Sequence, residues 1–189
     1  MPIIIGTNKI KDLYIGNTPL DKVYIGTKLI YQKNRDLIVT REILDQGSFE
    51  NVTPTYLTNQ VDGSDGFTIV GRVAKPWSSS NAYYNLKLRW DIEIDLTSYK
   101  TISWYAKKNV NHGSMSVYVS DGMMSTTNET TIYASNGVIY GNLATSWTEY
   151  SLDVSEITGT KIVSFVGGYS DSSGNTSSST SYCNIKFLC

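Results

Sequence analysis

Apolar and polar residues alternate along most of the chain beyond residue 36. In residues 86–96, LKLRWDIEIDL, every even position is apolar and every odd position is charged. A period of two predicts a half-buried antiparallel strand, because a helix would scatter these charges around its circumference. Further strands are predicted at residues 37–43, 67–71, 101–106, 115–120, 130–134, 138–140, 147–154, 161–166 and 182–188.

These segments predict an all-β fold. Turn residues separate them, and Asn136-Gly137 is the strongest hairpin signal in the chain. No segment keeps a helical apolar period over three turns. About nine strands in residues 36–189 are typical of an antiparallel β-sandwich, and we expect a jelly roll. Residues 170–181 are almost all Ser, Gly, Asn, Thr and Asp, so an exposed loop is expected there.

A ten-residue repeat occupies the start of the chain. Tyr-Ile-Gly recurs at residues 14–16 and 24–26, and the first unit has Ile4-Ile5-Gly6 in its place. The repeat predicts short strands that are too small to be stable alone. We therefore expect residues 1–32 to anchor or oligomerise the chain; the alternative is a meander that covers the edge of the larger domain. The expected assembly residues are Ile5, Tyr14, Ile15, Tyr24 and Ile25.

This segment resembles the short repeats that open many structural proteins of bacteriophages that infect Gram-positive bacteria. In those proteins such units precede a β-sandwich and attach or multimerise the polypeptide on the virion. The resemblance implies a virion structural protein, such as a decoration protein, a head fibre, or a tail or baseplate component. It implies other virion proteins as partners and a homo-oligomer, with a trimer favoured. The protein would be made in the host bacterial cytoplasm and located on the virion.

A second resemblance covers most of residues 65–189. The segment SWTEYSLDVSEITGTKIVSFVGGYS, followed by the final strand SSTSYCNIKFL, is similar to the closing part of jelly-roll carbohydrate-binding modules. WDIEIDLTSYKTISWYAKK resembles their central strands. This implies adhesion to host cell-wall polysaccharide through the sandwich. The alternative function is a carbohydrate-binding module, free or part of a glycan-degrading system.

Composition and charge further restrict the functional classes to which the protein could belong. The 189 residues are 40% hydrophobic, which supports a packed core. The net charge is −1 without a basic stripe, so we expect no nucleic-acid partner. No apolar run approaches the ~20 residues of a membrane span, and no basic region of a signal peptide is present. In the final predicted strand, positions 183, 185, 187 and 189 are expected to share one face. Cys183 and Cys189 lie too far apart in an extended strand to pair, and two free thiols indicate folding in a reducing cytoplasm.

The tryptophans divide into core and loop positions. Trp90 and Trp104 lie on the apolar faces of their strands and are expected in the core, while Trp147 is expected to close one end of the sandwich. Trp77 lies in a loop beside Ser and Asn residues and is followed by Tyr83 and Tyr84. Sugar sites need aromatic faces with polar neighbours, so these three form the candidate glycan platform. The alternative is that they pack against the domain.

Carboxylates supply the remaining candidate chemistry. One strand face carries Asp91, Glu93 and Asp95, at spacings that fit the paired acids of a glycosidase. The same face also carries Lys87 and Arg89, so a solvated charged surface is favoured.

Asp62 and Asp65 form a candidate calcium-binding loop, but a plain turn is the favoured interpretation. No other metal or cofactor is expected. The loop residue His112 has no obvious partner, and no nucleophile elbow, phosphate loop or dinucleotide motif is present. We therefore expect that the protein is not an enzyme. A small hydrolase is the third hypothesis, after the virion structural protein and the carbohydrate-binding module.

Overall fold

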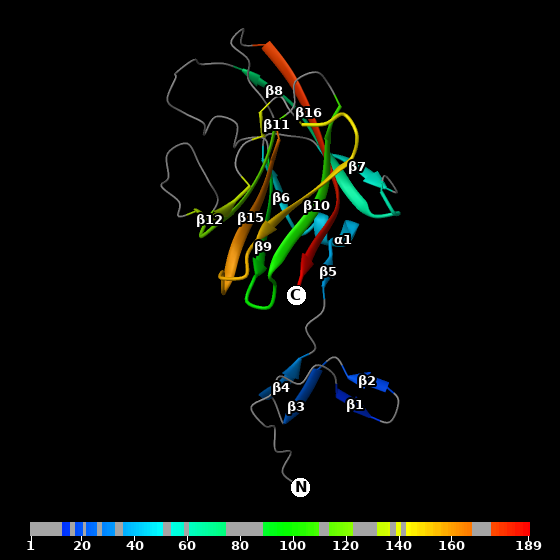
Figure 1. Cartoon of the computed structure of the whole chain (residues 1–189), viewed down its shortest axis with the longest axis vertical. Coiled ribbons are helices and arrows are strands. Elements are labelled where there is room, and N and C mark those ends of the chain that lie inside the picture. Colours follow the sequence, from blue (N-terminus) through cyan, green and yellow to red (C-terminus); the bar gives the residue numbers. More distant parts are fainter. Residues whose placement is uncertain are drawn as a thin grey trace. The chain divides into compact units, whose positions relative to one another are not determined.

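The computed structural model (Figure 1) describes the chain in separate ranges. These are residues 13–15, 18–20, 22–25, 28–32, 36–50, 54–58, 61–74, 89–109, 114–122, 132–136, 139–140, 143–167 and 175–189. The chain divides into two compact units, Met1–Arg35 and Asp36–Cys189. Each unit is described by itself below.

The first unit contains two antiparallel hairpins. Strand β1 (Leu13–Ile15) pairs with β2 (Thr18–Leu20), and β3 (Lys22–Ile25) pairs with β4 (Lys28–Gln32). The Tyr-Ile pairs of the second and third repeats lie in β1 and β3, so the ten-residue period places equivalent residues in the first strand of each hairpin. Ile5 lies outside the described residues.

The second unit is built from two antiparallel sheets (Figure 1). Sheet 1 has the order β14-β10-β16-β8-β7, with β5 also paired to β16. Its strands are β5 (Leu37–Ile38), β7 (Thr55–Thr58), β8 (Asp65–Ala74), β10 (Thr101–Lys108), β14 (Thr148–Asp153) and β16 (Asn175–Leu188). Strand β16 therefore lies at the centre of sheet 1.

Sheet 2 has the order β12-β11-β15-β9-β6, with β13 also paired to β11. Its strands are β6 (Ser48–Glu50), β9 (Arg89–Asp95), β11 (Ser114–Ser120), β12 (Ile132–Ser135), β13 (Ile139–Tyr140) and β15 (Thr160–Gly167). The predicted all-β fold with an antiparallel jelly-roll sandwich is confirmed.

The core lies between the two sheets and is rich in aromatic rings. Trp90 and Trp104 are fully buried, as predicted. Phe165 lies between them, with ring centroids 5.5 Å from Trp90 and 5.8 Å from Trp104. Tyr150 stacks on Trp104 at 6.2 Å. Such pairs contribute about 0.5–1.5 kcal/mol each beyond the burial of their area, so the inward residues of both sheets hold the sandwich together.

The predicted strand at residues 37–43 is wrong beyond Ile38. The chain leaves β5 and forms α1 (Arg41–Leu44), a single helical turn that buries Leu44 completely. The Arg41 backbone N–H donates to Asp65 Oδ2 at 2.7 Å. The helix turn therefore depends on a residue 24 positions away, which the local apolar pattern does not reveal.

The hairpin predicted at Asn136-Gly137 is also wrong. Strands β12 and β13 both pair with β11, and they follow one another along the same edge of it. Asn136 continues this ladder with its side chain, because its Oδ1 accepts from the Val117 N–H at 2.6 Å. A polar side chain thus replaces a backbone acceptor where the strand is interrupted.

The loop predicted at residues 170–181 is wrong for residues 175–181. These residues belong to β16 and pair with β8 along Asn175–Cys183. The Ser181 hydroxyl is 2.6 Å from Thr68 Oγ1 and accepts from Asn109 Nδ2 at 2.6 Å. Strand pairing and side-chain hydrogen bonds satisfy a polar sequence that composition alone assigns to a loop.

Candidate functional site

The outward face of sheet 1 gathers aromatic and charged side chains around Tyr105 in β10. Trp104 and Ala106 are fully buried, so the alternation along β10 turns the partly exposed Tyr105 outward. In the sheet register Tyr105 lies between Glu149 of β14 and Cys183 of β16. The Tyr105 hydroxyl donates to Glu149 Oε2 at 3.3 Å. We call this outward surface of β10, β14 and β16, with the adjoining turn at Asp62, the Tyr105 face.

A bulge in β16 shapes the centre of this face. Asn184 has φ 52°, in the left-handed region, and the pairing of β10 with β16 shifts register at this point. Tyr182 consequently packs its ring in the core, 5.3 Å from Phe67, while Cys183 lies on the opposite side. The sequence expectation that positions 183, 185 and 187 share one face is therefore wrong at Cys183.

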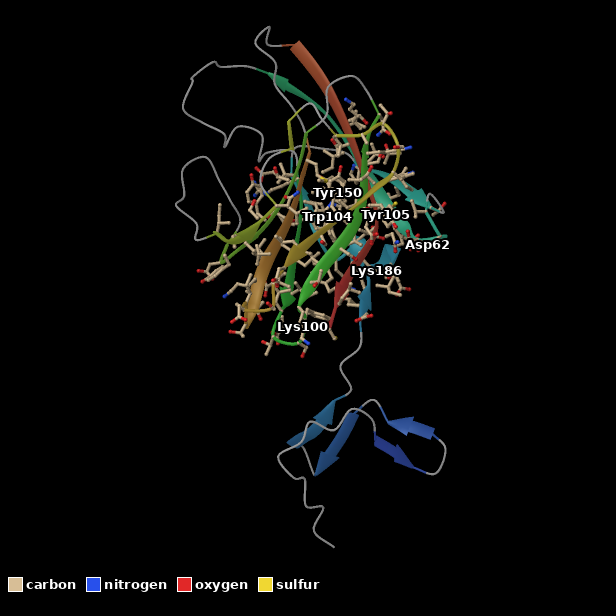
Figure 2. The ribbon with its side chains drawn as sticks, viewed as in Figure 1. Asp62, Lys100, Trp104, Tyr105, Tyr150 and Lys186 are labelled. Carbon is tan, nitrogen blue, oxygen red and sulfur yellow. The ribbon has the colours of Figure 1, made fainter. Side chains whose placement is uncertain are left out.

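Asp62 joins the face from the turn between β7 and β8. Its backbone is also left-handed, with φ 52°, and its Oδ2 accepts from Asn184 Nδ2 at 3.1 Å. The Lys186 ammonium is 3.8 Å from the same oxygen. Figure 2 shows Asp62 and Lys186 near Tyr105, on the side of the sandwich where β10 and β16 run. An aromatic ring and hydrogen-bonding groups of both charges thus lie together.

A second aromatic residue lies at one end of the same face. Trp147, which precedes β14, is partly exposed, and the Lys107 ammonium lies 4.7 Å from the centre of its ring. Lys107 follows Tyr105 by two residues and so shares its side of β10. The cation–π contact orders both side chains at the rim of the Tyr105 face.

The groups around the tyrosine shift its pKa and that of the neighbouring thiol. Burial, then the Glu149 carboxylate, raises the pKa of Tyr105 above its usual value, and Asp62 and Cys183 contribute to the same rise. Burial raises the pKa of the Cys183 thiol to about 11, and Asp62 adds to it, whereas a hydrogen bond from Ser64 lowers it. At neutral pH both the tyrosine and the thiol are protonated, and neither is an activated nucleophile.

The outward face of sheet 2 differs from the sequence expectation. Arg89 and Asp91 were assigned to a solvated charged face, but each is only 3% exposed. Arg89 Nε donates to Asp91 Oδ2 at 2.6 Å, and Ser164 Oγ donates to Asp91 Oδ1 at 2.5 Å. Glu93 and Asp95 are exposed, as expected. The prediction is therefore corrected for the Arg89–Asp91 pair, whose charges are satisfied beneath the surface.

The predicted ligand residues fall in different places. Trp77, Tyr83, Tyr84 and His112 lie outside the described residues. The two calcium candidates lie inside them, where the Asp62 carboxylate accepts from Asn184 and the Asp65 carboxylate accepts from the Arg41 N–H. In the described part of the chain, no group of three or more His, Cys, Asp or Glu side chains is arranged to hold a metal ion. None of the described helices has the length and apolar character to cross a membrane.

Of the residues that form this face, the sequence singled out Asp62, as a calcium candidate, and missed the others. Tyr105 carries a local signal, because it alternates with Trp104, which was assigned to the core. Asn184 and Lys186 gave no signal, because the bulge and the ion pair both depend on Asp62, more than 120 residues away.

Comparisons with known proteins identify the fold. No protein-family model matches the sequence, and no curated protein does either. Among solved structures, the chain is similar to the CBM22-1–GH10 modules of xylanase 10B from Clostridium thermocellum in complex with xylohexaose, with 13% identity and a TM-score of 0.50. That match covers 81% of this chain and 28% of the xylanase chain, so this chain spans little more than a quarter of the xylanase's length.

Two other similar structures are carbohydrate-binding modules. A CBM4 structure has 16% identity and a TM-score of 0.43 over 80% of this chain and 84% of its own. The family 11 carbohydrate-binding module of Clostridium thermocellum, in complex with a β-1,3-1,4-mixed-linked tetrasaccharide, has 11% identity and a TM-score of 0.44 over 94% of both chains. At 13% identity the likeness to the CBM22-1–GH10 modules concerns the fold, and the second unit is a jelly-roll β-sandwich.

Proposed function

We propose that residues 36–189 form a carbohydrate-binding module without catalytic activity, which binds a glycan across the Tyr105 face. The observation that carries the proposal is the partly exposed Tyr105 ring, with Glu149 on one side and Asp62 and Lys186 on the other. Sugar rings stack on aromatic faces through their C–H groups, and polar side chains around the ring bind the hydroxyls. The jelly-roll likeness to carbohydrate-binding modules supports this function.

Binding assays with defined oligosaccharides test the proposal. Xylohexaose, cellotetraose and a mixed-linked β-glucan tetrasaccharide are the first probes, because similar solved structures hold them. Titration calorimetry with the full chain should detect binding of at least one probe. Tyr105→Ala should weaken that binding about tenfold or more, equivalent to ~1.4 kcal/mol.

Tyr133→Ala is the matched control. Tyr133 is an aromatic residue that is 46% exposed and lies in β12 at the edge of sheet 2, away from the Tyr105 face. Its removal should leave binding unchanged. Equal binding by the wild type and Tyr105→Ala would refute the proposed site. Release of reducing sugar from any bound probe would refute the absence of catalysis.

We also propose that the first unit assembles the protein. Its hairpins have strands of three to five residues, and isolated two-stranded hairpins are marginally stable in water. A partner surface supplied by other copies would stabilise them. Light scattering should give an oligomer for the full chain and a monomer for residues 36–189. A monomeric full chain would contradict this. Location on a virion stays a prediction from the sequence resemblance.

A further inference from the structure

Asn184 carries a buried acceptor without a donor. The residue is 5% exposed, and its Nδ2 donates to Asp62. Its Oδ1 is buried and has no hydrogen-bond partner in the part of the chain that the structure describes. A buried polar atom without a hydrogen-bond partner destabilises a protein. An unpaired atom beside the face proposed for binding therefore calls for a donor supplied from outside the chain.

The backbone holds this amide in a fixed place. Asn184 and Asp62 both have φ 52°, a conformation that costs most L-residues free energy and that Asn and Asp tolerate best. The hydrogen bond between their side chains joins the bulge of β16 to the turn before β8. Unfavourable conformations of this kind persist at positions where a particular geometry serves function.

The groups around the Tyr105 ring accept hydrogen bonds more than they donate them. Glu149 Oε2 accepts from the Tyr105 hydroxyl, and the Asp62 side chain on the other side is 54% exposed. Lys186 offers the donor, since its ammonium lies 3.8 Å from Asp62 and its side chain is 31% exposed. Sugar hydroxyls both donate and accept, so they match this arrangement. The cations of the face are Lys186, which pairs with Asp62, and Lys107, which lies over the Trp147 ring at the rim. A carboxylated sugar beside Asn184 would bring its charge against the exposed Asp62 carboxylate and compete with it for Lys186.

We propose that Asp62, Asn184 and Lys186 form a hydroxyl-binding subsite beside Tyr105 that selects neutral sugars over uronic acids. One hydroxyl of a sugar stacked on Tyr105 donates to Asn184 Oδ1, and a neighbouring hydroxyl bridges Asp62 and Lys186. The ligand reaches the amide by displacing the exposed ends of those two side chains. This inference rests on the proposed function and specifies its ligand class.

Calorimetry with neutral and acidic probes tests the selection. Xylohexaose and cellotetraose are the neutral probes, and trigalacturonate is the acidic probe. The wild type should bind a neutral probe at least tenfold more tightly than trigalacturonate. Asn184→Gly retains the left-handed backbone and removes the amide, and Lys186→Met retains the apolar stem without the ammonium. Each should weaken neutral binding about fivefold or more while Tyr133→Ala has no effect.

Asp62→Asn provides a test that does not depend on the stability of the Asn184 variant. Asparagine tolerates the left-handed backbone and removes the negative charge, so discrimination against trigalacturonate should fall severalfold. Unchanged discrimination would contradict the charge argument.

The outcomes separate the two proposals. If Tyr105→Ala abolishes binding while Asn184→Gly and Lys186→Met bind like the wild type, the subsite is overturned and the proposed function stands. Preferential binding of trigalacturonate by the wild type would overturn the selection in the same way. If Tyr105→Ala binds like the wild type, or no probe binds, the proposed function fails and the subsite fails with it.

Discussion

Arg89 and Asp91 lie two residues apart on β9 and form an ion pair on the outward face of sheet 2, with Nε 2.6 Å from Oδ2. Both side chains are nearly inaccessible to solvent. Arg89 also contacts Glu50 through Nη2 at 2.6 Å, so its guanidinium is shared between two carboxylates. The removal of one partner from a buried pair leaves an uncompensated charge in a medium of low polarity.

Asp91→Ala leaves Arg89 in contact with Glu50 but removes the acceptor of Arg89 Nε and of the Ser164 hydroxyl. It should therefore lower the free energy of unfolding by about 1–3 kcal/mol. Urea unfolding followed by tryptophan fluorescence measures the change. Glu93→Ala, an exposed carboxylate on the same strand, is the control and should change stability by less than about 0.5 kcal/mol. Equal effects of the two substitutions would show that the Arg89–Asp91 pair has no special role.

Gly66→Ala should destabilise the sandwich by about 1–3 kcal/mol or more. A Cβ atom at Gly66 would lie 2.2 Å from the Tyr182 carbonyl oxygen and 2.6 Å from Cys183 Cβ, so β8 and β16 would have to separate. Gly122→Ala is the matched control, since its Cβ would meet nothing within 4 Å. Thermal unfolding compares the two, and a Gly66 variant as stable as the Gly122 variant would contradict this close approach of the strands.

The two thiols should react at very different rates in the folded protein. Both cysteines are free, but Cys183 is buried and Cys189 is exposed. A disulfide reagent at pH 8 should label one thiol rapidly in the native state and both thiols in denaturant. Cys189→Ser should abolish the rapid phase. Rapid labelling of the Cys189→Ser variant would show that the Cys183 thiol is accessible.

Cys183 should also reduce stability at alkaline pH. Its pKa is about 11 in the folded protein, above that of an exposed thiol, so between about pH 9 and 11 the folded state holds a proton that the unfolded state releases. The protonated thiol contributes its full stabilisation below this pH window. That contribution to the free energy of unfolding is lost as pH rises through the window. Cys183→Ser should show a smaller loss of stability from pH 8 to 11 in urea titrations. Identical pH profiles would contradict the shift.

The sequence predicts the inward side chains of the sandwich well. Trp90 and Trp104 lie in the core because a strand with one buried face must alternate, and their neighbours show the alternation directly. The same rule turns Tyr105 outward. The neighbours of Tyr105 depend on which strands pair with β10 and in which register. The local sequence pattern does not predict that pairing.

The features that failed prediction depend on contacts between distant residues. The left-handed bulge at Asn184 reverses the expected orientation of Cys183, and it is joined to Asp62 across the sheet. Asn136-Gly137 has the composition of a hairpin, yet β11 offers one continuous edge on which both flanking strands pair. Local propensity is a weak guide wherever pairing with another strand decides the conformation.

The central place of β16 has a consequence for biosynthesis. Among the described strands of sheet 1, β8 and β10 do not pair with each other, and each pairs with β16. While a ribosome is still translating the preceding part of the chain, both strands carry unpaired edges, which are open to contact with other nascent chains. Sheet 1 can close only after residues 175–188 have left the exit tunnel, so the domain is expected to complete its folding late and to depend on protection until then.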